Sequence, residues 1–192
     1  MRAVVSPRRW LERLRHFRFW PVLDLEKTAR LLGPAKIVNM LGDPHAIRVG
    51  AHSIVRGELL TFAHGGSISI GEWCYVGEGT RIWSAASIVI GNRVLIAHNV
   101  NIHDTDSHPL DARQRHQHFV EIATVGHPGH LDNVTSAPVH IGDDVWIGFN
   151  AILLKGATVG PRTIIGAGSV VVGEVPSDSL YVRDRVVRRL ER

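Results

Sequence analysis

The feature that most constrains the fold of this chain is a run of six six-residue units in unbroken register from Ile141 to Pro176. The first position of each unit is aliphatic, the second is Gly in four of the six units, and the fifth is small or β-branched. A period of six matches neither a helix face, with ~3.6 residues per turn, nor the two-residue alternation of a simple strand. The run predicts an all-β fold, a parallel β-helix in which each turn buries its apolar side by stacking on its neighbours.

The same period extends toward the N-terminus less regularly. Repeats begin near Ile47, and clearer units start at Ile70 and Ile90. The step between these two is two residues longer than three units, which indicates a small corner insertion around Ser84–Ser87. The period then disappears from His103 to Pro138, and a long non-periodic segment inside a compact repeat fold is usually functional. We therefore expect a loop over residues 103–138 that is extruded from the coils.

Both ends of the chain fall outside the repeats. Residues 1–46 are predicted to form a helical cap, with an amphipathic helix over 7–19 and a second short helix over 24–32. The β-helix itself is expected over 47–176, and residues 177–192 form a basic tail that ends in a short helix. The first helix carries five arginines. It could cover the open first coil, pack on a neighbouring subunit, or rest on an anionic membrane surface.

The charge is weakly basic, at +4 from 22 Lys and Arg against 18 Asp and Glu, and the positive residues gather at the two ends. No basic stripe interleaved with aromatic residues runs through the repeats, so nucleic acid is not an expected partner. No run approaches the ~18 apolar residues of a membrane span, and no signal peptide is predicted. The single cysteine, Cys74, is expected to be a small core residue, and we expect a cytoplasmic protein.

The residues on either side of the loop are more specific than the repeats. The segment 96–111 reads Ile-Ala-His-Asn-Val-Asn-Ile-His-Asp-Thr-Asp-Ser-His-Pro-Leu-Asp, and Val-Trp-Ile-Gly at 145–148 and Ile-Gly-Ala-Gly-Ser at 165–169 follow the loop. Over 47–176 the chain resembles the left-handed β-helix acyltransferases of the hexapeptide-repeat family, in the sugar and polysaccharide O-acetyltransferase branch related to the galactoside and maltose acetyltransferases. This resemblance implies acetyl-CoA as co-substrate, a sugar or glycan acceptor and a homotrimer, with no metal.

The resemblance places the catalytic base at His108, in the His-Pro-Leu-Asp element that starts the loop. A sugar hydroxyl is a poor nucleophile near neutral pH, and an imidazole can accept its proton during attack on a thioester. The alternative is that His108 is an ordinary surface histidine. The other loop histidines are expected to lie on the loop surface: His116, His118, His127 and His130.

Several residues near the start of the loop and on the preceding coil are candidates for contact with the acceptor: His103, Asp104, Asp106, Glu78 and Trp83. The two aspartates could orient imidazoles, contact sugar hydroxyls or cap the local backbone. Glu78 lies in the region where galactoside acetyltransferases carry the Asn that partners their base.

The resemblance also implies a coenzyme A groove between adjacent subunits. The residues that match its positions are Trp146, Gly148, Phe149, Gly166, Ala167 and Arg185. Two departures affect this match. Gly173-Glu174 replaces the family's Lys-Asp, and the segment 180–185 is shorter than the family's Arg-containing ending.

Two other functions remain compatible with the sequence. Carbonic-anhydrase-like β-helix proteins bind zinc between subunits through two histidines five positions apart and a third from an earlier coil. His98 and His103 have this spacing, and His64 could be the third ligand, so that a bound water would ionise near neutral pH. The second alternative is a non-catalytic scaffold that keeps the β-helix but has lost cofactor binding.

Overall fold

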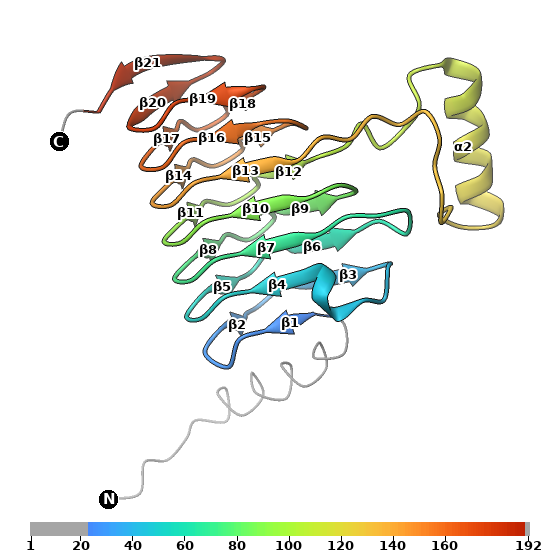
Figure 1. Cartoon of the computed structure of the whole chain (residues 1–192), viewed down its shortest axis with the longest axis horizontal. Coiled ribbons are helices and arrows are strands. Elements are labelled where there is room, and N and C mark those ends of the chain that lie inside the picture. Colours follow the sequence, from blue (N-terminus) through green and yellow to red (C-terminus); the bar gives the residue numbers. More distant parts are fainter. Residues whose placement is uncertain (1–22, 191–192) are drawn as a thin grey trace, which may run out of the picture.

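The structure is a computed structural model that describes residues 23–190. In this part of the chain, successive coils stack along one axis, and each complete coil contributes strands to three sheets (Figure 1). We call these sheets A, B and C, and name the corners between them the A–B, B–C and C–A corners. Neighbouring strands are parallel throughout sheets A and C, consistent with the left-handed β-helix expected from the six-residue units.

The strands are short, and within each sheet they follow one another in space from the first coil to the last. Sheet A contains β1 (Asp24–Leu25), β4 (Ile47–Val49), β7 (Ile68–Ile70), β10 (Ile88–Ile90), β13 (Val139–Ile141), β16 (Thr158–Val159) and β19 (Glu174–Val175). Sheet B contains β2 (Arg30–Leu31), β5 (Ile54–Val55), β8 (Tyr75–Val76), β11 (Leu95–Ile96), β14 (Trp146–Ile147), β17 (Ile164–Ile165), β20 (Ser179–Val182) and β21 (Arg185–Arg189). Sheet C contains β3 (Lys36–Asn39), β6 (Glu58–Thr61), β9 (Arg81–Ser84), β12 (Asn101–His103), β15 (Ile152–Leu153) and β18 (Val170–Val171).

The core consists of the aliphatic first positions of the units, stacked in columns inside the three sheets. In sheet B, Val76, Ile96, Ile147 and Ile165 occupy successive coils and are all fully buried. Each such side chain contributes about 1.5–3 kcal/mol of apolar burial. Cys74 is buried in the same core, which confirms that it is a core residue.

The predicted helix over 24–32 is wrong, because the β-helix begins earlier than Ile47. Strands β1, β2 and β3 form a first coil that pairs in parallel with the second. Leu25, Leu31 and Ile37 recur every six residues and face the core side. The units are hard to detect in the sequence because Glu26 and Leu32 replace the usual Gly. The predicted helix over 7–19 lies outside the described residues.

The predicted C-terminal helix is also wrong. Strand β21 runs antiparallel to β20 and extends sheet B by a hairpin. The turn between them has Arg183 in the left-handed region, at φ 63°, and all residues of β21 are exposed. An antiparallel strand rich in Arg covers the last edge of the sheet, which limits pairing with other chains.

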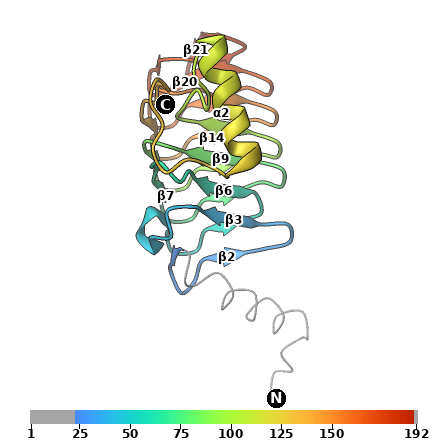
Figure 2. The same cartoon turned by 90° about the vertical axis from the view of Figure 1, so that its right-hand side faces the viewer.

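The predicted loop leaves the stack at the C–A corner, between β12 and β13, and it contains helix α2 (Ala112–Thr124). The loop projects to one side of the coils, and α2 stands beside them (Figures 1 and 2). A short 3-10 helix, η2 (Pro44–Ala46), precedes β4. Among the described residues, no helix has the length and apolar character needed to cross a membrane.

Candidate functional site

The base of the loop is fixed by a buried carboxylate. Asp104 is fully buried and accepts hydrogen bonds from Ser84 Oγ at 2.6 Å, Ala85 N at 2.7 Å and Ala86 N at 3.0 Å. These residues form the corner insertion expected around 84–87. The geometry therefore gives Asp104 a backbone-capping role. Its carboxylate is already hydrogen-bonded and is buried away from any sugar substrate.

Asp106 follows two residues later in the loop and is bonded to the coils through Lys155. Its carboxylate pairs with Lys155 Nζ at 2.5 Å, and its backbone N–H donates to Thr135 O at 3.0 Å. Both side chains of the ion pair are about one quarter to one third exposed. The two ends of the loop are thus held together just before the chain reaches His108.

His108 is exposed and contacts a second histidine. The Nδ1 atoms of His108 and His118 are 3.1 Å apart, and the two rings meet at an interplanar angle of 60°. His118 lies on α2 and is only 6% exposed, so its prediction as a loop surface residue is wrong. No pattern in the sequence distinguishes it from His116 on the same helix.

Helix α2 is attached to the segment that carries His108. Asp111 caps the helix by accepting hydrogen bonds from the backbone N–H groups of Arg113 and Gln114, at 3.1 and 2.9 Å. Arg115 Nη1 donates to the carbonyl oxygens of Pro109 and Leu110, at 3.3 and 2.8 Å. The His-Pro-Leu-Asp element therefore fixes the start of the helix as well as the position of His108.

A column of aromatic rings lies at the C–A corner beside the loop. His103 stacks on Trp83 with ring centroids 4.9 Å apart, and Phe62 contacts both Trp83 and His64. The nitrogens His64 Nε2, Trp83 Nε1 and His103 Nε2 are buried, with no hydrogen-bond partner among residues 23–190. Burial lowers the pKa of His64 and of His103, so both rings favour the neutral form.

The residues expected to bind the cofactor lie on sheet B and on the B–C corner. Trp146 faces outward from β14 and is 53% exposed. Gly148 and Phe149 form the next corner, where His98 stacks on Phe149 at 5.3 Å. Gly166 and Ala167 occupy the same corner one coil later, and the Gly166 N–H donates to Tyr181 O.

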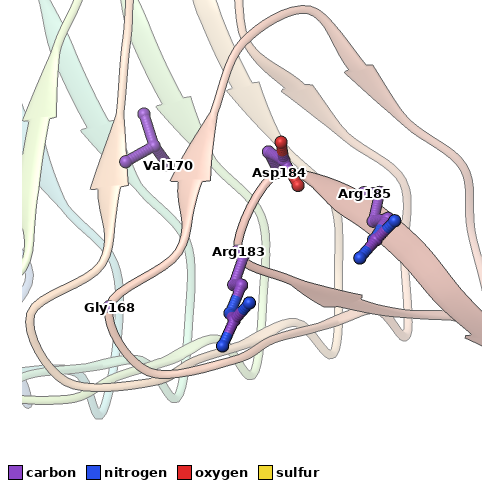
Figure 3. Close-up of a pocket in the computed structure, with 5 residues that line it drawn as sticks. All are labelled: Gly168, Val170, Arg183, Asp184 and Arg185. Atoms are coloured by element: carbon purple, nitrogen blue, oxygen red, sulfur yellow. The ribbon is translucent and has the colours of Figure 1, made fainter.

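A cationic pocket lies at the end of this corner. It is a cavity of about 480 Å³, lined by Gly168, Val170, Arg183, Asp184 and Arg185. In Figure 3 the side chains of Arg183 and Arg185 extend to the same side of the hairpin, and Asp184 extends to the other side. Arg185 therefore lies close to the late coils, and Arg183 is a second cation that the sequence did not single out.

The remaining candidates are held in separate contacts within one chain. Glu78 lies on the B–C corner and pairs with Arg56 at 2.9 Å, while His108 belongs to the loop at the C–A corner. His98 is also on the B–C corner, whereas His103 and His64 belong to the aromatic column. Within residues 23–190, no three His, Cys, Asp or Glu side chains form a group that could hold a metal ion.

Comparison with known proteins agrees with the repeats. A family model described as bacterial transferase hexapeptide (six repeats) matches residues 138–173. Galactoside O-acetyltransferase from Escherichia coli (strain K12) is 31% identical over 136 residues, which is 67% of this chain and 57% of that protein. The chain therefore spans less than two thirds of the length of this curated relative.

Solved structures share the architecture. A hexapeptide-repeat acetyltransferase from Vibrio cholerae has a TM-score of 0.59 at 25% identity, covering 94% of this chain and 82% of that one. An N-acyltransferase from Bacillus cereus, crystallised with dTDP and 3-hydroxybutyryl-CoA, has a TM-score of 0.70 at 16% identity and covers 100% and 92%. The latter likeness is one of fold. The matched repeats, the related acetyltransferase and the stacked parallel coils show that this chain belongs to the hexapeptide-repeat transferase family.

Proposed function

We propose that the protein is an acetyl-CoA-dependent O-acetyltransferase that acts on a hydroxyl of a sugar or of a cell-surface polysaccharide precursor. His108 is its general base. The observation that carries this proposal is an exposed imidazole at the start of the extruded loop, whose Nδ1 is held against a buried second ring. The similarity to galactoside O-acetyltransferase supports the choice of a sugar hydroxyl over an amine.

The reaction needs one proton to move twice. His108 accepts the proton of the acceptor hydroxyl while the hydroxyl oxygen attacks the thioester carbonyl carbon. The tetrahedral intermediate then collapses, the carbon–sulfur bond breaks, and the imidazolium returns the proton to the leaving thiolate. The products are an acetyl ester and free coenzyme A. General-base assistance of this kind contributes about 10²–10⁴-fold in rate.

The acceptor is proposed to bind at the C–A corner between the loop and the coils. Trp83 and His103 supply stacked rings there, and Asp106 supplies a carboxylate at the start of the loop that keeps solvent contact. Aromatic faces of this kind pack against the apolar faces of sugar rings, while polar groups bind hydroxyls. Glu78 contributes to acceptor binding only if a neighbouring subunit brings its own B–C corner next to the loop.

Coenzyme A is proposed to lie along the late coils of a neighbouring subunit, with its phosphates in that subunit's cationic pocket, because this pocket and His108 lie at different corners of one chain. Arg183 and Arg185 supply charge-assisted donors for phosphate oxygens. The outward residues Trp146 and Phe149 and the close-packed corner at Gly148, Gly166 and Ala167 border the path of the pantetheine arm. Arg185→Ala should raise the KM for acetyl-CoA about tenfold with little change in kcat.

We also propose a homotrimer that packs through the outer face of sheet B. This face carries one apolar side chain from each of six successive coils in register: Ile54, Tyr75, Leu95, Trp146, Ile164 and Leu180. Leu95 and Trp146 are 52% and 53% exposed in the single chain. A contiguous, partly exposed apolar stripe of this kind is typical of a protein–protein interface. A cytoplasmic location and contact of residues 7–19 with an anionic membrane surface are also part of the proposal.

The trimer is tested with two matched substitutions on one coil. Leu95→Glu places a charge within the sheet B stripe, and Val89→Glu places the same charge on the outer face of sheet A, where Val89 is 38% exposed. Light scattering should report dissociation for Leu95→Glu and an intact trimer for Val89→Glu. Dissociation by both variants, or by neither, would contradict the assignment of the interface to sheet B.

The proposed activity is tested by the release of free thiol from acetyl-CoA in the presence of a panel of sugars and polysaccharide precursors. His108→Ala should bind acetyl-CoA and assemble normally but lose at least about 10²-fold in kcat. The matched control is His116→Ala, an exposed histidine on α2, which should keep full activity. Near-normal turnover of His108→Ala would remove His108 from the base role, and the absence of transfer to every acceptor would refute the activity.

A further inference from the structure

The contact between His108 and His118 restricts the protonation of both rings. Two imidazole nitrogens at 3.1 Å form a hydrogen bond only if one carries a hydrogen and the other presents a lone pair. Because both atoms are Nδ1, the protonation of each Nε2 follows from the direction of this bond. The direction therefore decides whether Nε2 of His108 carries a hydrogen or a free lone pair.

The two directions have opposite chemical consequences. If His108 donates through Nδ1–H, its Nε2 has a free lone pair and can accept the proton of a hydroxyl. If His118 donates instead, His108 carries its hydrogen on Nε2 and cannot act as a base from that atom. A neutral histidine presents the lone pair at the required nitrogen in every molecule only when a partner fixes its tautomer.

The surroundings of His118 favour a neutral ring that can accept. Burial is the main cause that lowers the pKa of His118, and a positive charge on His108 lowers it further. Glu121 on the same helix raises it, and His127 after the helix lowers it. From the coils, His64 is close enough to interact electrostatically with His118. A neutral ring in this position is able to receive a hydrogen bond from a charged His108.

We propose that His118 is the positioning residue for the general base, and that its Nδ1 accepts the Nδ1–H of His108. This bond holds His108 in the tautomer with a free Nε2 lone pair, and it stabilises the imidazolium that forms after proton transfer. The inference rests on the proposed function, because it assigns a partner to the base of that reaction.

The fold holds both rings in place for this role. Asp111 caps α2, Arg115 binds the carbonyl groups of Pro109 and Leu110, and the buried position of His118 limits its rotation. The distance between the two nitrogens is therefore set by the same His-Pro-Leu-Asp element that starts the loop. A charge-assisted hydrogen bond forms without further rearrangement when His108 gains its proton.

The test compares two substitutions of His118. His118→Asn keeps an acceptor, because its Oδ1 can occupy the place of Nδ1, while His118→Phe keeps the ring and removes the acceptor. We expect His118→Phe to lower kcat about 10- to 100-fold with an unchanged KM for acetyl-CoA. His118→Asn should recover most of the loss, and His116→Phe on the exposed side of α2 should have no effect. Combining His118→Phe with His108→Ala should cost no more than His108→Ala alone.

A second measurement does not depend on transferase activity. Imidazole ¹⁵N chemical shifts of the ¹⁵N-histidine-labelled protein report which nitrogen carries the hydrogen, and His108→Ala identifies the signals of His108. We expect the Nδ1–H tautomer in the unmodified protein and in His118→Asn, and a tautomer mixture in His118→Phe. The Nε2–H tautomer in the unmodified protein would overturn the proposal. So would equal losses of kcat in the Phe and Asn variants, or a normal kcat in the Phe variant while His108→Ala is inactive. That last result would leave the proposed function intact.

Discussion

Two corners of the same β-helix satisfy their polar groups in different ways. At the A–B corner, the fourth positions of four successive coils carry Arg93, Asp144, Arg162 and Asp178, all with φ between 55° and 58°. Arg93 pairs with Asp144 through two hydrogen bonds of 2.6 and 2.9 Å, and Arg162 pairs with Asp178 through two of 2.7 Å. The Arg93 hydrogen bond lowers the pKa of Asp144. These four side chains alternate in charge and form two ion pairs within the chain, and we call them the closed ladder of the A–B corner.

The C–A corner instead contains buried polar atoms that lack hydrogen-bond partners among the described residues. Its aromatic column contains three buried ring nitrogens without partners among the described residues, and the loop that begins there presents His108 to solvent. Buried polar groups in native proteins are nearly always bonded, and exceptions commonly mark functional positions. The comparison teaches that the Arg and Asp side chains of the A–B corner satisfy one another within the chain, whereas the C–A corner keeps buried ring nitrogens without partners and is the better candidate for binding a ligand.

The largest expected effect is the loss of stability when the buried carboxylate of Asp104, at the C–A corner, is removed. Asp104→Ala leaves Ser84 Oγ and the N–H groups of Ala85 and Ala86 without an acceptor. Since each unpaired buried group costs about 1–3 kcal/mol, the free energy of unfolding should fall by about 3 kcal/mol or more. Urea denaturation at matched protein concentration measures this loss. The control is Asp132→Ala in the exposed part of the same loop, and an equal effect of both would refute the capping role.

The next effect compares two glycines with similar backbone angles. Gly66 has φ 117° at the C–A corner, and a Cβ there would overlap the carbonyl oxygen of Ser84. Gly126 has φ 120° after α2, and a Cβ there would meet nothing within 4 Å. Both alanine variants carry the same backbone strain, so their difference isolates the close approach of the two coils. We expect Gly66→Ala to cost about 1–3 kcal/mol more than Gly126→Ala in urea denaturation. Equal losses of unfolding free energy would mean that the two coils move apart to accommodate the added Cβ with no further loss of stability.

The same contrast explains which parts could be predicted from the sequence. The stack from β13 to β19 follows from a local six-residue period, because every unit uses the same positions for core and turn. The first coil follows the same period, but its second positions are not glycine, and the sequence signal was too weak. Arg93 and Asp144 are 51 residues apart because the loop separates their coils, so their pairing becomes visible only after the stack is built.

The residues of the candidate site could also be predicted only in part from the sequence. His108 could be predicted because it belongs to a recognisable His-Pro-Leu-Asp element. His118 could not, because a non-periodic loop gives no rule for which of its histidines is buried. Burial there depends on how α2 lies against the segment that begins with His108, and this is a property of tertiary packing.

A pH effect should follow from three histidines near the C–A corner. Burial is the first cause that lowers the pKa of His64, His103 and His118 below the ordinary value of about 6.5. Below that pH the unfolded chain binds more protons than the folded one, so the free energy of unfolding decreases as the pH falls toward the folded pKa values. Above about pH 6.5 this contribution is fully present.

Urea midpoints at about pH 7.5 and about pH 5.5 measure the effect. His103→Gln should reduce the difference between the two midpoints, whereas His116→Gln on the exposed side of α2 should leave it unchanged. A midpoint that rises on acidification, or a difference unaltered by His103→Gln, would contradict the assignment of the pH dependence to buried histidines.

The smallest expected effect tests the closed ladder of the A–B corner. Asp178→Asn removes the charge that pairs with Arg162, while Asn tolerates the left-handed backbone at φ 55° that this position requires. The two side chains are 42% and 30% exposed, and such partly exposed pairs contribute less than about 1 kcal/mol. The urea midpoint should therefore fall only slightly, and the difference from the unmodified protein should shrink in about 0.5 M NaCl because salt screens exposed charges. A loss as large as that of Asp104→Ala would contradict this weak contribution, and would mean that the paired surface charges of the A–B corner hold the coils together as strongly as the buried carboxylate of the C–A corner does.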